Sequence, residues 1–158
     1  MGVAGGPTAR RGVPLRALSK LRQNIARENG QKARRLYEEG LGRGDHMVVD
    51  ALVSEDFRDL KRGLHGKVGM ERLITDLWSS YPDLSVSVEG QEADGDLVRT
   101  RLFLSGTDRG SGVMWFPPTG QSVGFKAEFL DRFRGGKLFE HAGEADTEEL
   151  LRQLGHYE

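Results

Sequence analysis

The sequence contains no cysteine, so neither disulfide bonds nor thiolate chemistry is available to it. Long apolar runs are missing too: no stretch approaches the roughly 20 residues that a membrane span needs. The pair Arg10-Arg11 is not followed by the apolar segment of a secretory signal. We therefore expect a cytoplasmic protein without a membrane partner.

Motifs that hold metals, nucleotides or a nucleophilic serine are also absent. The histidines show neither an HxH nor an HExxH spacing, and without cysteine a zinc site would need carboxylates. No GxGxxG or GxxxxGK[ST] segment stands between a strand and a helix, and there is no GxSxG elbow. The sequence thus predicts no metal and no cofactor.

The formal net charge of −1 hides an asymmetry along the chain. Residues 1–35 hold nine Lys or Arg and a single acid, Glu28, so this arm carries +8, and the remainder, with 14 basic and 23 acidic residues, carries −9. The arm has no aromatic residue to stack on a base, which argues against a nucleic-acid partner. We expect residues 1–28 to form a basic, partly disordered or helical extension ahead of one domain at 29–158.

Helical spacing dominates the first half of the chain. Apolar residues follow a helical period on both sides of Asn29-Gly30, a pattern that fits either one kinked helix or two. Asp45 is placed to cap a short helix, and a brief strand is expected at 54–60. The clearest amphipathic helix covers 68–81 and ends before Pro82.

After Pro82 the hydrophobic period changes from 3.6 to 2. Alternation predicts strands at 84–88, 97–106, 121–133 and 137–143, with turns at Asp94-Gly95-Asp96 and Gly135-Gly136. Helices followed by an antiparallel meander predict an α+β fold, in which a curved sheet covers the helices. The strand at 121–133 points Asp131 the same way as three phenylalanines, so this carboxylate is expected to be paired, at an edge or in a cavity.

Carboxylates and one histidine near the last strands are the candidates for acid–base chemistry. Each has a structural alternative: Asp146 and Glu149 match a helix capping box, and Asp108 lies in a turn-like segment. Glu140 and His141 point to opposite faces of a strand, so only one of them can face a pocket. Arg132 is placed to pair with Glu128 or Glu140 rather than with a substrate anion.

Seven segments, taken in order, resemble the SnoaL-like polyketide cyclases, also called ester cyclases, of the NTF2-like superfamily. They are "ARRLYEEGLGRGD", "SEDFRD", "GKVGMERLITDLWSSYPDLSVSVEGQEADGDLV", "LSGTDRG", "FPPTGQSV", "DRFRGGKLFEHAGEAD" and "LLRQLG". The resemblance implies an α+β cone with one deep, mostly apolar pocket, and a homodimer or homotetramer. It also implies a small-molecule, polyketide-like substrate.

The namesake cyclases close a ring by intramolecular aldol condensation without a metal or cofactor. Their essential aspartate corresponds to Asp146, and the region of their assisting histidine corresponds to Asp131-Arg132. The sequence departs from the family where Asp108 and Ala142 replace a frequent histidine and tryptophan, and where Leu60 stands near the position of a family histidine that comes after the Asp56-Phe57 pair. The catalytic candidates are Asp146, Asp131 and His141, and the substrate-binding candidates are Arg132, Phe129, Trp115, Phe116, Trp78 and Asp108.

Two alternatives to ring closure stay open at this stage. Paired carboxylates, Asp131 with Asp146 or Asp108, would suit an NTF2-like epoxide hydrolase or isomerase. A non-catalytic small-molecule-binding module is the other alternative, because this fold serves many functions.

Overall fold

The computed structural model describes residue 12, residues 14–110 and residues 118–155. The helical segments are α2 (Leu15–Arg35), the π-helical η1 (Leu36–Leu41), α3 (His46–Leu52), α4 (Gly66–Ser80) and α5 (Thr147–Gln153). The strands are β1 (Val53–Asp59), β2 (Ser85–Asp94), β3 (Leu97–Thr107), β4 (Ser122–Arg134) and β5 (Lys137–Ala145). Most helical segments precede the antiparallel meander of β2 to β5, and α5 follows it, which confirms the predicted α+β class.

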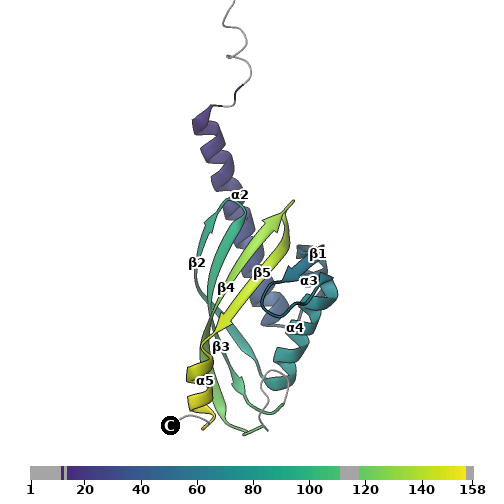
Figure 1. Ribbon diagram of the computed structural model, residues 1–158. Helices are drawn as coiled ribbons and strands as arrows, with labels where there is room; N and C mark the ends of the chain where they lie inside the picture. Colours follow the sequence, from purple (N-terminus) through teal and green to yellow (C-terminus); the bar gives the residue numbers. More distant parts are fainter. Residues whose placement is uncertain (1–11, 13, 111–117, 156–158) are drawn as a thin grey trace, which may run out of the picture.

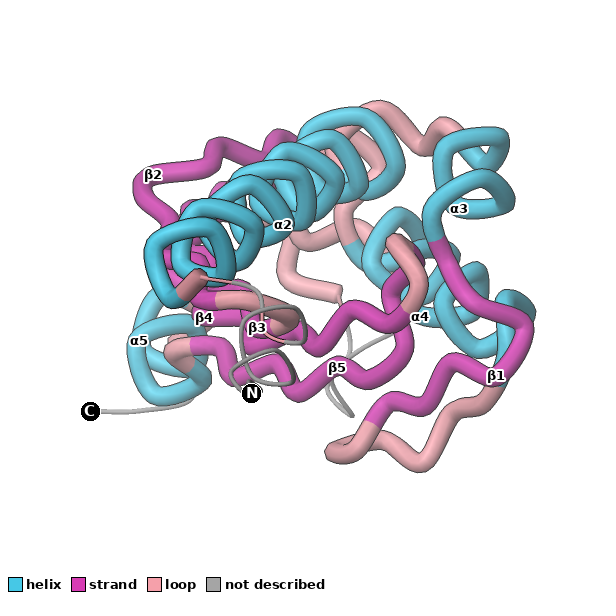
Figure 2. Tube along the Cα trace, turned by 90° about the horizontal axis from the view of Figure 1, so that it is seen from above, coloured by secondary structure: helices cyan, strands magenta, loops and turns pink. Residues whose placement is uncertain are grey.

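The five strands form one curved sheet in the order β1-β5-β4-β3-β2 (Figure 1). Strands β2 to β5 pair antiparallel, as expected, whereas β1 joins the edge parallel to β5. Gly95, Gly135 and Gly136 take positive φ angles at the two tight turns, where glycine carries no steric cost. Seen from above, the sheet curves around α2 and α4 (Figure 2). The inner face of this curve holds the core.

Helix α2 runs without a break through Asn29 and Gly30, which decides between the two helical alternatives. Both residues are buried, and they bind the β2–β3 hairpin: Asn29 Nδ2 donates to the Gly95 carbonyl, and Gln91 Nε2 donates to the Gly30 carbonyl. Tertiary hydrogen bonds thus offset the weak helix propensity of this pair. The predicted boundary between residues 28 and 29 falls inside this continuous helix and stays a prediction.

Helix α4 matches the predicted amphipathic helix, and its core-facing residues include Met70, Leu73 and Leu77. Asp45 caps α3 by accepting a hydrogen bond from the Met47 N–H at 3.0 Å, as its position predicted. Strand β4 is buried at every second residue from Val123 to Phe133. This alternation turns one face of β4 toward the helices and the other toward solvent.

Candidate active site

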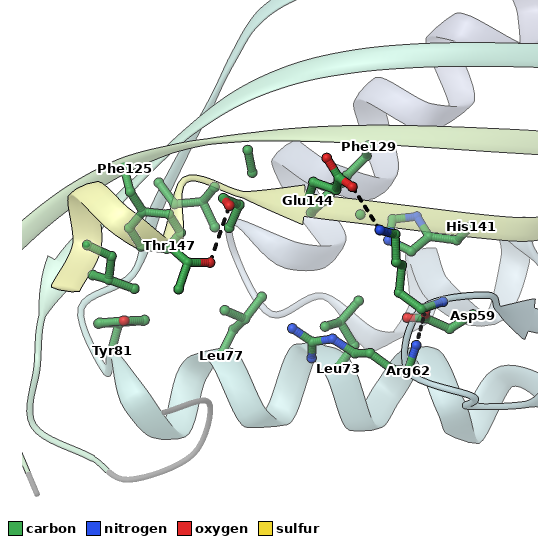
Figure 3. A pocket seen from close by; sticks show the side chains of 16 residues that line it. Asp59, Arg62, Leu73, Leu77, Tyr81, Phe125, Phe129, His141, Glu144 and Thr147 are labelled. Atoms are coloured by element: carbon green, nitrogen blue, oxygen red, sulfur yellow. Dashed lines mark hydrogen bonds and ion pairs between the residues drawn. The ribbon is translucent and has the colours of Figure 1, made fainter. Parts of the chain in front are cut away.

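A cavity of about 430 Å³ lies between α4, α5 and the inner face of the sheet (Figure 3). Aliphatic and aromatic side chains form most of its wall, and polar groups gather at two places. The lining residues are Asp59, Lys61, Arg62, Leu73, Leu77, Tyr81, Leu104, Phe125, Ala127, Phe129, His141, Gly143, Glu144, Ala145, Thr147 and Leu150. An apolar hollow with a few converging polar groups is the usual form of a small-molecule site.

A buried hydrogen-bonded network of three side chains borders this cavity, and His141 is its member in the cavity wall. His141 Nδ1 is 2.6 Å from Asp131 Oδ1, and the Tyr37 hydroxyl donates to Asp131 Oδ2. The same hydroxyl is 3.3 Å from His141 Nδ1. All three side chains are at most 2% exposed. Because a buried charge is costly unless it is paired, the network accounts for a carboxylate on an apolar strand face.

Three neighbouring strands bring the polar groups into one row. Asp131 on β4 is the register partner of His141 on β5, and His141 is in turn the partner of Asp59 on β1. Side chains at paired positions share a face of the sheet, so all three lie on the inner one. The inner face therefore holds His141 rather than Glu140, and it holds Asp131 as a paired carboxylate, which was one of the predicted alternatives.

Phe129 and Gly143 shape the space beside the imidazole. The Phe129 ring meets His141 edge-on, with a centroid distance of 4.7 Å, and Tyr37 at 4.9 Å. A Cβ at Gly143 would lie 2.9 Å from the Phe129 ring and 3.0 Å from His141 Nε2. Glycine at this position therefore leaves Nε2 open on the cavity side, while Nδ1 is held by Asp131.

Two buried tyrosines keep their protons because of their surroundings. Burial, followed by the negative charge of Asp131, raises the pKa of Tyr37 well above its usual value. Its hydroxyl is therefore a donor to Asp131 at neutral pH. Burial and the charge of Asp108 raise the pKa of Tyr81, at the other part of the cavity, to about 12.

The turn after β1 supplies the polar groups at the cavity mouth. Asp59 Oδ1 accepts hydrogen bonds from the backbone N–H groups of Lys61 and Arg62, at 3.0 and 2.9 Å. Lys61 Nζ is 2.8 Å from Glu144 Oε1, and this contact lowers the pKa of Glu144. The Arg62 guanidinium also lines the cavity.

Tyr37 and Asp59 are members of the site that the sequence reasoning missed. Tyr37 occupies an apolar position of a helical segment, where it counts as a core residue by period alone. A signal for it exists, because a buried tyrosine hydroxyl normally needs a polar partner. Asp59 ends a short strand, and nothing in its local pattern separates it from a turn aspartate.

Asp146 lies apart from this network, at the start of α5. Its side chain is exposed, and Oδ1 accepts a hydrogen bond from the Glu149 N–H at 3.1 Å, the geometry of a helix N-cap. It borders a different hollow, which Glu89, Arg101 and Lys126 also line. The structure therefore brings Asp131 and His141 together but does not bring Asp146 to them.

Trp78 also lies outside the main cavity among the described residues. Its indole Nε1 donates to the Leu41 carbonyl at 2.8 Å, and its ring borders a separate hollow with Arg43 and His46. Asp108 Oδ2 accepts hydrogen bonds from the Thr119 N–H and hydroxyl, at 2.9 and 3.0 Å, which is a loop-stabilising arrangement. Of the apolar candidates, Phe129 is the one that the structure places in the cavity wall.

Arg132 lies on the outer face of β4. Its Nε is 3.1 Å from Glu140 Oε1, one of the two partners predicted for it, and Nη1 is 3.3 Å from Asp96 Oδ2. Trp115 and Phe116 lie outside the residues that the structure describes.

Within residues 12, 14–110 and 118–155, no group of three His, Asp or Glu side chains is arranged to hold a metal ion. No helix among these residues is long and apolar enough to cross a membrane.

A curved sheet wrapped around helices, with an apolar cavity inside, is the NTF2-like fold. The model of the SnoaL-like polyketide cyclase family matches residues 31–154. This chain is a member of that family. A comparison with curated protein sequences gave no match.

Solved structures agree with this fold. TsrD from Streptomyces laurentii is 22% identical, with a TM-score of 0.74 over 82% of this chain and 96% of its own. A SnoaL-like protein from Jannaschia sp. CCS1 is 24% identical, with a TM-score of 0.75 over 82% of this chain and 93% of its own. A SnoaL-like polyketide cyclase from Agrobacterium tumefaciens is 23% identical, with a TM-score of 0.67 over 75% and 92%. At these identities the similarity shows the fold alone.

Proposed function

We propose that this protein catalyses an intramolecular aldol-type ring closure of a polyketide-type intermediate by acid–base chemistry, without a cofactor. The observation that carries the proposal is the hydrogen-bonded pair of Asp131 and His141, which Tyr37 holds in place. The Nε2 atom of His141 faces an apolar cavity. A base that is oriented by a buried carboxylate, next to space for a substrate, has the geometry that general base catalysis requires. Membership of the SnoaL-like polyketide cyclase family supports the substrate class.

In the proposed reaction, His141 Nε2 takes a proton from a substrate carbon that lies between two carbonyl groups. The Nδ1–H donates to Asp131 throughout, so the carboxylate stabilises the imidazolium that forms. The resulting enolate carbon attacks a second carbonyl of the same molecule, a C–C bond forms, and the new alkoxide receives the proton from Nε2. One proton leaves carbon and one reaches oxygen, so the step needs no oxidant or reductant.

The remaining cavity residues would fold the substrate and exclude water. Leu73, Leu77, Leu104 and Phe125 present apolar surface along the cavity. Burial of an extended substrate against such a surface brings its two reacting carbons together, and this proximity supplies a large part of the rate of an intramolecular reaction. The Phe129 ring, edge-on to the imidazole, limits the tilt of His141.

A proton-exchange experiment tests the base without the natural substrate. The protein is incubated in D₂O with an aromatic β-keto ester, and the loss of the signal from its acidic methylene protons is followed by NMR. The wild type should accelerate exchange well above the solvent rate, and His141→Gln should remove most of this acceleration. Acceleration that persists in folded His141→Gln would show that another group is the base.

The family correspondence gives a competing base, Asp146, which caps α5 and is not itself among the residues that line the cavity, although its neighbours Ala145 and Thr147 are. Epoxide hydrolysis or isomerisation on the same cone is a further alternative. Hydrolysis would place oxygen from ¹⁸O-labelled water in the product, whereas ring closure would not. The homodimer or homotetramer that the resemblance implies is measurable by light scattering.

A further inference from the structure

Arg62 is a charged cavity residue to which the proposed mechanism gives no role. Figure 3 shows its side chain extending from the turn after β1 toward Leu73 and Leu77 on α4. Among the residues that the structure describes, its guanidinium has no ion pair or hydrogen-bond partner. A guanidinium carries several donors in a fixed planar fork that matches a carboxylate. An unpaired fork against an apolar cavity wall is therefore suited to a ligand.

The backbone under Arg62 is held in place by the turn itself. Asp59 Oδ1 binds the N–H groups of Lys61 and Arg62, and the Asp59 carbonyl accepts from the Gly63 N–H at 2.9 Å. The Asp59 N–H in turn donates to the Leu64 carbonyl at 2.8 Å. Gly63 adopts a φ of 69°, which favours glycine and closes the turn. The backbone of Arg62 is therefore already ordered, so less conformational entropy is lost when its guanidinium binds an anion.

The other charges at the mouth leave Arg62 as the cation that a ligand can use. Lys61 is paired with Glu144 at 2.8 Å, so these two charges offset each other. Asp59 directs one carboxylate oxygen to two backbone donors. Because the Asp59 carboxylate also lines this mouth, a singly charged group suits it better than a phosphate dianion.

We infer that the ligand of this cavity is a carboxylic acid, with its carboxylate bound by Arg62 and its apolar body against α4 and the inner face of the sheet. This inference rests on the proposed function for the identity of the site, and it deepens it by defining the substrate class. The reacting carbon would then lie toward His141, which lines the same cavity. Anchoring one end of a flexible substrate fixes which of its carbons reaches the base.

The effect of ligand charge on affinity can be measured with two probes of nearly the same shape, 2-naphthoate and its neutral analogue 2-naphthamide. We expect the wild type to bind the naphthoate about tenfold more tightly than the amide in calorimetric titrations at neutral pH, the scale of a charge-assisted hydrogen-bonded pair. Arg62→Gln should reduce this preference to less than about twofold. Arg62→Lys should retain part of it, since lysine keeps the charge but loses the fork.

Arg99→Gln is the matched control, because it removes an arginine that is paired with Glu128 on the outer face of the sheet and does not line the cavity, and it should leave the preference within about twofold of wild type. Equal binding of the two probes by the wild type overturns the inference. So does an unchanged preference in Arg62→Gln, or the absence of binding by both probes. Asp131→Asn should keep the preference. A chain that selects the naphthoate through Arg62 yet fails in proton exchange would refute the proposed catalysis and leave the carboxylate site standing.

Discussion

Strands β4 and β5 place charged groups on both faces of the sheet, and the groups on the two faces differ in their exposure to water. On the inner face Asp131 is 1% exposed and binds Tyr37 and His141. On the outer face the neighbouring Arg132 pairs with Glu140, and their side chains are 44% and 23% exposed. Water screens the outer pair, so it contributes little, whereas the inner network has no water to replace a lost partner. Asp131 and Arg132 are neighbours in the sequence, but they lie on opposite faces of the sheet, and their surroundings differ for this reason.

The largest effect is expected when the proton-exchange rates of Asp131→Asn and Asp146→Asn are compared. Asp131→Asn removes the charge that orients and stabilises the imidazolium, and it should lower the proton-exchange rate by about 10²- to 10⁴-fold. Asp146→Asn, at the exposed cap, should change the rate by less than about threefold, because an asparagine also caps a helix. Circular dichroism verifies that both variants are folded. Equal losses in the two variants would place Asp146 in the catalytic machinery.

The next test compares two buried tyrosines. Tyr37→Phe leaves Asp131 Oδ2 without its donor, and it should lower the free energy of unfolding by about 1–3 kcal/mol in urea titrations. The Tyr81 hydroxyl has no hydrogen-bond partner among the described residues, so Tyr81→Phe should cost less than about 0.5 kcal/mol at neutral pH. A Tyr37→Phe variant as stable as Tyr81→Phe would show that the network adds little to stability.

Tyr81 should instead affect the free energy of unfolding at alkaline pH. Its pKa is about 12 in the fold, whereas a tyrosine in the unfolded chain titrates near 10. Between these values the unfolded state has lost the proton and the folded state has kept it, so stability falls as pH rises. At about pH 11 this effect reaches about 1 kcal/mol. Urea titrations across this range should show a shallower loss for Tyr81→Phe than for wild type; parallel losses would contradict the raised pKa.

The smallest effect is expected at the cap of α5. Asp146→Ala removes the acceptor for the Glu149 N–H, and loss of such a cap costs about 1 kcal/mol. Asp146→Asn is the control, because its side chain keeps the acceptor. Thermal melts of the two variants measure the difference. A loss in Asp146→Ala that Asp146→Asn shares in full would mean that the charge matters, and not the cap.

The local elements followed from sequence patterns because each depends on neighbours along the chain. The amphipathic helix before Pro82, the two glycine-containing turns, the Asp45 cap and the inward direction of Asp131 were all predictable in this way. The pattern left one helix or two open at Asn29-Gly30, because the hydrogen bonds that hold this pair in one helix come from residues of the β2–β3 hairpin more than 60 positions away. The parallel pairing of β1 with β5 was hidden for the same reason.

For the candidate site, too, some features were predictable from local sequence patterns and others depended on contacts between distant segments. By itself the sequence determined the family, the α+β class and the inward direction of Asp131, because period and segment order are properties of the chain. It left open whether Glu140 or His141 faces inward. Only the tertiary structure decided which groups meet: Tyr37 from a π-helical segment reaches Asp131 across 94 residues, while Asp59, His141 and Asp131 align through strand register. It also separated Asp146 from the cavity and left Arg62 facing it. Register and burial arise from packing between distant segments, and no local pattern encodes them.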